Sequence, residues 1–67
     1  MKQRMLKALK ANALGQIEKH KVNIEIYMHN AVGIGEHSDV MSAVECEIDK
    51  ISHFHDQLEV IEKYLEG

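Results

Sequence analysis

Apolar residues recur along two segments of the chain at intervals of three and four, with occasional gaps of seven. This spacing predicts helices, because residues three, four or seven apart leave a helix on the same side. Alternation typical of a strand is not sustained anywhere. The stripe of the first segment consists of Leu6, Ala13, Ile17, His20, Ile24 and Tyr27, and that of the second consists of Met41, Val44, Ile48, Ile51, His55, Leu58 and Leu65.

One clear break separates the two segments, at residues 30–38, where Gly33 and Gly35 lie close together and no apolar periodicity continues. Ser38 is suited to cap the N-terminus of the second helix. The sequence therefore predicts a helix over about 3–31, a loop over about 32–37 and a helix over about 38–65. Together they form a single domain over residues 1–67.

The two stripes mirror each other about Ile34, in the middle of the break, so that position 20 pairs with 48 and position 17 with 51. A chain that folds back at this point brings the stripes face to face. The charges agree: residues 1–30 hold six basic and two acidic residues, and residues 36–67 hold nine acidic and two basic ones. The sequence thus predicts an all-α fold, an antiparallel two-helix hairpin whose oppositely charged ends are neighbours.

Further apolar residues lie beside both stripes and widen the apolar face of each helix. A face this wide suits a bundle better than a seam between only two helices. We therefore expect two copies of the hairpin to pair as a homodimer and form a four-helix bundle. The residues expected at this oligomer interface are Val40, Phe54, Ile61, Leu9 and Leu14.

Composition narrows the classes of protein to which the chain can belong. Cys46 is the only cysteine, which removes disulfides and cysteine-rich zinc sites as sources of stability. No apolar segment reaches the length of a membrane span. The net charge of −3 and the presence of only three aromatic residues argue against nucleic acid. These features predict a soluble cytoplasmic protein that binds neither membrane nor nucleic acid.

The five histidines are the one unusual component, but no two of them are three or four residues apart, as ligands on one helix would be. The candidate metal ligands are therefore a mixed set, Asp49, His53 and Asp56. His20 and His55 lie on the apolar stripes, where a histidine is more often a satisfied core residue than a ligand. The residues near the break that are candidates for contact with a ligand or partner are His29, Asn30, Glu36 and His37.

Catalytic chemistry finds no support in the sequence. Cys46 has an acidic residue on either side, which does not favour a reactive thiolate. No phosphate-binding loop is present, because Gly33 and Gly35 lack the lysine and the preceding strand that such a loop needs. We therefore expect neither enzymatic activity nor a cofactor.

Three runs of the sequence carry a resemblance: His20-Lys-Val-Asn-Ile-Glu-Ile-Tyr27, Asn30-Ala-Val-Gly-Ile-Gly-Glu-His-Ser-Asp39 and His55-Asp-Gln-Leu-Glu59. In these the chain resembles small uncharacterised helical proteins of T4-like and marine tailed phages. The resemblance implies a phage-associated origin and no particular activity. The function expected from the sequence is a non-enzymatic structural or protein-interaction module. The alternative is a bundle that binds a metal or small ligand through its histidine, aspartate and glutamate side chains.

Overall fold

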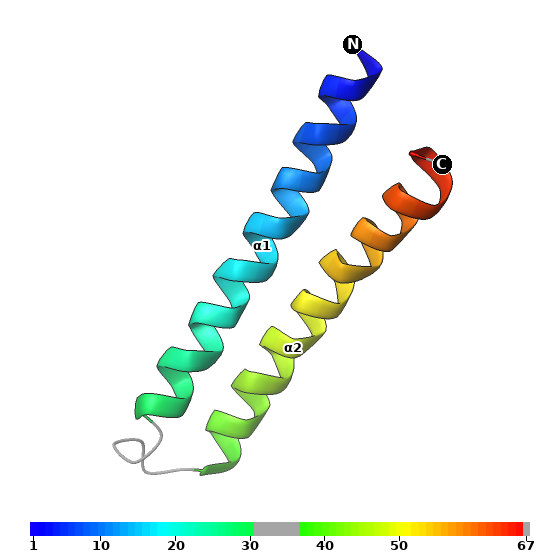
Figure 1. Cartoon of the computed structure of the whole chain (residues 1–67). Coiled ribbons are helices and arrows are strands. Elements are labelled where there is room, and N and C mark those ends of the chain that lie inside the picture. Colours follow the sequence, from blue (N-terminus) through cyan, green and yellow to red (C-terminus); the bar gives the residue numbers. More distant parts are fainter. Residues whose placement is uncertain (31–36, 67) are drawn as a thin grey trace.

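The structure, a computed structural model, describes residues 1–30 and 37–66, apart from the side chains of Asn30, His37 and Ser38. Helix α1 spans Lys2–Asn30, helix α2 spans His37–Val60, and one π-helical turn, η2, continues α2 over Ile61–Leu65. The helices run antiparallel side by side, with both termini at one end of the molecule (Figure 1). The predicted all-α helical hairpin is confirmed. Most of the predicted loop, including Ile34, lies outside the described residues.

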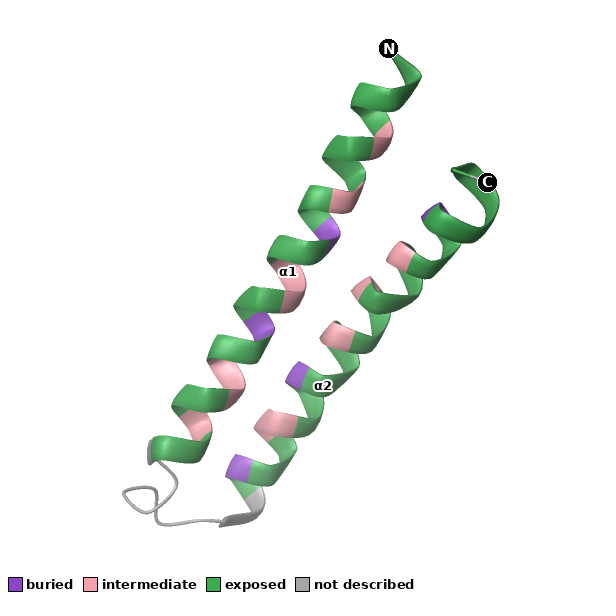
Figure 2. Cartoon of the chain, viewed as in Figure 1, coloured by how far each residue is buried: buried purple, intermediate pink, exposed green. Residues whose placement is uncertain are grey.

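The inner side of α1 is the one that the sequence pattern predicts. All members of its stripe are buried or half-buried, and Ala13 is fully buried. Figure 2 shows the buried and half-buried positions of both helices along the seam between them. The stretch Val22 to Met28, whose β-branched residues would also suit a strand, continues α1 as helix.

The inner side of α2 agrees with the prediction at Val44, Ile51 and Leu58 and differs from it at the other four positions of the stripe. Met41 and Ile48 belong to the predicted stripe but are 67% and 49% exposed, and His55 and Leu65 are exposed as well. Beside the predicted Val44, Ile51 and Leu58, the seam is lined by Val40, Glu47, Phe54 and Ile61. The physical reason is that two rows of apolar residues run side by side along α2, one through Met41 and Ile48 and the other through Val40, Phe54 and Ile61. The contact between Glu47 and His20 turns the second row into the seam.

The hairpin is slender and leaves much apolar surface exposed. Its extents are 50 × 16 × 11 Å and its radius of gyration is 15.4 Å, whereas a globular domain of this length has a radius of about 11 Å. Among the described residues, no large side chain is fully buried. The part of the chain that the structure describes contains no helix that combines the length and apolar character required to cross a membrane.

Candidate functional site

The middle of the seam contains three polar residues that contact one another: His20, Asn23 and Glu47. We call them the polar cluster. His20 and Asn23 are one turn apart on α1, so both face Glu47 on α2. The Nδ1 atom of His20 is 2.5 Å from Oε2 of Glu47, and the amide of Asn23 donates to both carboxylate oxygens at 3.3 Å. His20 and Glu47 are each only 6% exposed, so these hydrogen bonds are shielded from water.

An aromatic side chain covers part of the polar cluster. The ring of Phe54 is stacked on that of His20, with a centroid separation of 6.3 Å and an interplanar angle of 12°. His53 meets the same phenyl ring edge-on at 4.9 Å. Phe54 therefore belongs to the inner side of α2, where it limits the access of water to His20.

The electrostatics of the polar cluster favour an ionised Glu47. Burial is the largest single influence on the pKa of this carboxyl group and raises it, whereas the hydrogen bonds from His20 and Asn23 lower it. The charges of His20 and Lys50 act in the same direction, so the pKa of Glu47 lies below its usual value of 4.5. The cluster is thus arranged to hold a carboxylate between the helices.

A histidine oriented by a carboxylate also occurs in hydrolases, where it serves as a general base for a nucleophile. The nearby nucleophiles do not complete such a site. Cys46 is exposed, and the hydroxyl of Ser52 donates to the carbonyl oxygen of Ile48 at 3.0 Å. Within the described residues, every buried side-chain nitrogen and oxygen has a hydrogen-bond partner. The polar cluster therefore favours the observed rotation of α2 against α1, because a rotation that turned Glu47 outward would leave the buried His20 without this hydrogen-bond partner.

The candidate metal ligands are not brought together. Among the residues that the structure describes, no group of three or more histidine, cysteine, aspartate or glutamate side chains is arranged to hold a metal ion, and this applies to Asp49, His53 and Asp56. His53 is instead engaged by neighbours on its own helix: its Nε2 atom is 3.2 Å from the amide nitrogen of Gln57.

The candidate ligand-contact residues near the break are described only in part. His29 is exposed near the end of α1. Asn30 is the last residue of α1 and His37 is the first of α2, but their side chains lie outside the described part of the structure, and Glu36 lies outside it entirely.

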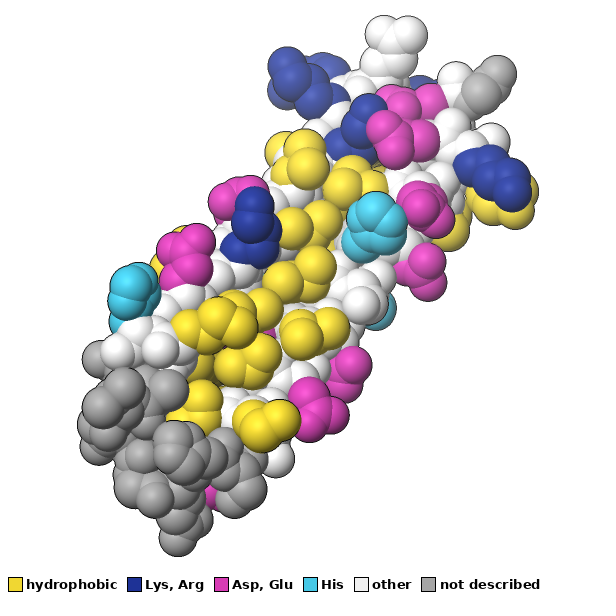
Figure 3. Space-filling model, turned by 60° about the horizontal axis from the view of Figure 1, so that its bottom comes forward, with side chains coloured by type: hydrophobic (Ala, Val, Ile, Leu, Met, Phe, Trp, Pro, Cys, Tyr) yellow, Lys and Arg dark blue, Asp and Glu magenta, His cyan; other side chains and the backbone are white. Residues whose placement is uncertain are grey.

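One side of the hairpin carries a continuous band of apolar side chains that extends over both helices (Figure 3). Half-buried residues of the seam form its middle, and exposed apolar residues flank them. Because residues seven apart share a side of a helix, Leu14 and Met28 lie on one edge of α1, and Met41 and Ile48 lie on one edge of α2. We call this band the apolar face; it comprises Leu14, Ile17, Ile24, Met28, Met41, Val44, Ile48, Ile51, Leu58 and Leu65.

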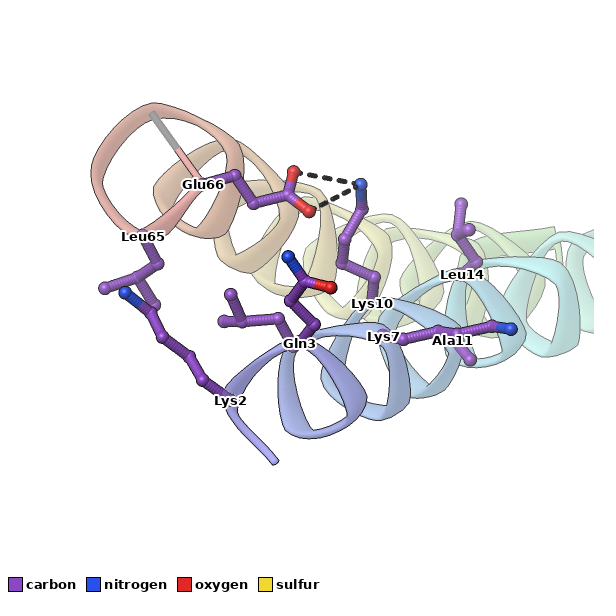
Figure 4. Close-up of a pocket in the computed structure, with 9 residues that line it drawn as sticks. Lys2, Gln3, Lys7, Lys10, Ala11, Leu14, Leu65 and Glu66 are labelled. Atoms are coloured by element: carbon purple, nitrogen blue, oxygen red, sulfur yellow. Dashed lines mark hydrogen bonds and ion pairs between the residues drawn. The ribbon is translucent and has the colours of Figure 1, made fainter.

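At the end that carries both termini, the apolar face opens into a groove of about 580 Å³ between α1 and η2. Leu6, Leu14 and Leu65 provide apolar lining, and Lys2, Lys7 and Lys10 provide positive charge. Figure 4 shows Lys10 reaching across to Glu66, whose two oxygens accept hydrogen bonds from Nζ at 3.0 and 3.3 Å. Glu62 lies 3.9 Å from the same lysine. The groove is thus amphipathic, with apolar lining and a charged rim.

The residues expected at an oligomer interface separate into two groups. Val40 and Ile61 are buried within the single chain, and Phe54 is half-buried against His20, so these three already pack in the seam. Leu9 and Leu14 are about half exposed. They are five residues apart, so their side chains point in directions that differ by about 140° around the axis of α1. Only Leu14 belongs to the apolar face.

Comparisons of the chain with protein families, with curated proteins and with solved structures found no match.

Proposed function

We propose that the chain is a non-enzymatic structural or protein-interaction module, in which two hairpins pair through their apolar faces and form a four-helix bundle. The observation that carries this proposal is the exposed area. A compact monomeric protein of this mass exposes about 4300 Å², whereas the hairpin exposes 5331 Å². The excess of about 1000 Å² is close to the roughly 800 Å² that each partner buries in a stable interface.

A second copy of the chain fits the apolar face better than a lipid surface does. The face is a narrow band with half-buried Ile17, Ile24 and Ile51 along its middle, which suits the ridges of another helix pair. The charged rim at its end carries both lysine and glutamate side chains. A surface of mixed charge favours a partner that also carries both signs, and the hairpin itself is such a partner.

The resemblance of residues 20 to about 60 to small tailed-phage proteins supports an origin in a phage. In that setting the outer sides of the bundle would contact a phage or host protein. The single exposed cysteine, Cys46, fits a reducing compartment and supports a cytoplasmic location.

The test compares two substitutions of equally exposed apolar residues. Ile48 is 49% exposed on the apolar face, and Val22 is 48% exposed on the outer side of α1. Light scattering at micromolar concentration should give the wild-type protein twice the chain mass of 7.7 kDa. Ile48→Glu buries one charge per copy at the interface and should weaken the dimer by at least about 100-fold, while Val22→Glu should leave it intact. A folded wild-type monomer under these conditions would refute the proposal.

A further inference from the structure

We infer that the two copies meet with the C-terminal ends of both α1 helices at the same end of the bundle, so that the groove of each copy receives η2 of the other. This inference rests on the proposed dimer and adds its geometry. It follows from the way in which apolar and charged residues are distributed along the apolar face.

The two edges of the apolar face change character along their length. On α1 the edge positions are seven residues apart and alternate in character, with a charged residue at one end and an apolar residue at the other: Lys7, Leu14, Lys21 and Met28. On α2 the corresponding positions run from an apolar end to a charged one: Met41, Ile48, His55 and Glu62.

The polar cluster shows which positions on the two edges lie level with each other. His20 and Asn23 both contact Glu47, which sets the register of α1 against α2. Lys7 is thirteen to sixteen residues before this pair, so in antiparallel helices it lies level with residues 60–63. Met28 is five to eight residues after it and lies level with residues 39–42. Each hairpin therefore has one charged end, with Lys7 and Glu62, and one apolar end, with Met28 and Met41.

A two-fold axis can relate the faces of two hairpins in two ways. With the axis parallel to the helices, α1 of one copy lies against α2 of the other, and Lys7 meets Glu62 of the second copy while Met28 meets its Met41. With the axis perpendicular to the helices, each helix lies against its own counterpart. That arrangement places Lys7 against Met28 and Glu62 against Met41, so Lys7 is desolvated without an acidic partner and Glu62 keeps only the contact with Lys10 of its own chain. Lys21 lies against an apolar residue in both arrangements, Ile48 or Leu14, so the two ends of the face decide between them, and the charges at these ends favour the parallel axis.

The groove provides an independent argument for the same arrangement. With the parallel axis, η2 of the second copy lies over the first three turns of α1, where Lys2 and Lys7 line the groove. This turn carries Glu62 and Leu65, one acidic and one apolar side chain. They match the lysines and the leucine lining of the groove, respectively. The groove of each hairpin is then filled by the end of its partner.

Distance measurements between two spin labels on the full chain test this inference. Cys46→Ser removes the native thiol, and His29→Cys places a label on an exposed position away from the apolar face. His29 is about 20 Å from the middle of α1. The inferred arrangement predicts a label separation of about 25–30 Å, and the perpendicular axis predicts more than about 40 Å. Lys19→Cys, near the middle of α1, is the matched control, because its label separation is short in both arrangements.

Charge reversal gives a second readout from the same dimer. Lys7→Glu and Glu62→Lys should each weaken dimerisation by about 5- to 30-fold, because two pairs are lost per dimer. The double variant, which exchanges the charges, should recover to within about threefold of wild type. Label separations above about 40 Å, or a double variant weaker than both single variants, would overturn the arrangement. A protein that is monomeric in light scattering would instead refute the proposed dimer itself.

Discussion

Ala13 is the fully buried position of the seam and offers a direct test of how closely the helices pack. Replacing it with leucine adds three carbon atoms where the two helices leave no exposed space. If the seam could take them in, their burial would stabilise the fold by about 2 kcal/mol. A tightly packed contact cannot accommodate them, and overpacking costs about 1–3 kcal/mol. Because the helix axes must then move apart, we expect Ala13→Leu to destabilise the hairpin by this amount.

Thermal unfolding followed by circular dichroism measures the effect. For a domain of this size, about 1–3 kcal/mol corresponds to a decrease in Tm of roughly 5–20 °C. Ala8 is exposed on the outer side of the same helix, so Ala8→Leu controls for the change in helix propensity and should shift Tm by no more than about 2 °C. All melts are compared at one protein concentration, because dimerisation makes Tm depend on concentration. An Ala13→Leu variant as stable as Ala8→Leu would refute close packing at this point.

Two further predictions concern Glu47 and Gly15. Because the pKa of Glu47 is lower in the folded protein, its stabilising effect is complete above the usual pKa of 4.5 and is lost as pH falls through the lower, folded-state pKa. Wild-type Tm should therefore drop more steeply than that of Glu47→Gln between about pH 5 and pH 3, and parallel curves for the two proteins would contradict the assignment. A Cβ atom added at Gly15 would meet nothing within 4 Å, and the residue lies inside α1. Gly15→Ala should thus stabilise the helix by about 0.5–1 kcal/mol, and an unchanged or lower unfolding free energy would count against a regular helix there.

The fold and the inner side of α1 could be predicted from the sequence because both depend on a contrast between apolar and polar positions. Every member of the α1 stripe, including His20, lies in the seam. The sequence pattern favours a satisfied core residue at this histidine but does not identify its partner. Pairing the two stripes about Ile34 placed Ile48 opposite His20. The structure shows that the partner of His20 is the neighbouring residue, Glu47.

The inner side of α2 could not be found in this way because its central residue is charged. An interpretation based on hydrophobicity places a glutamate on the outside of the hairpin. It therefore predicted that the row containing Met41, Ile48 and His55 faces α1. The three-residue contact with His20 and Asn23 reverses that choice, since hydrogen bonds compensate the carboxylate in the seam. Such a contact joins residues more than twenty positions apart, and no local pattern contains it.

A carboxylate in the middle of α2 also makes this helix selective in its choice of neighbour. Many amphipathic helices in a cell present an unbroken apolar stripe, and any of them that packed on the inner side of α2 would strand Glu47 away from water without a donor. A helix avoids this penalty only if it brings hydrogen-bond donors to the same level, as α1 does with His20 and Asn23. The residue that weakens the apolar character of the seam therefore disfavours pairing of α2 with a helix that lacks such donors.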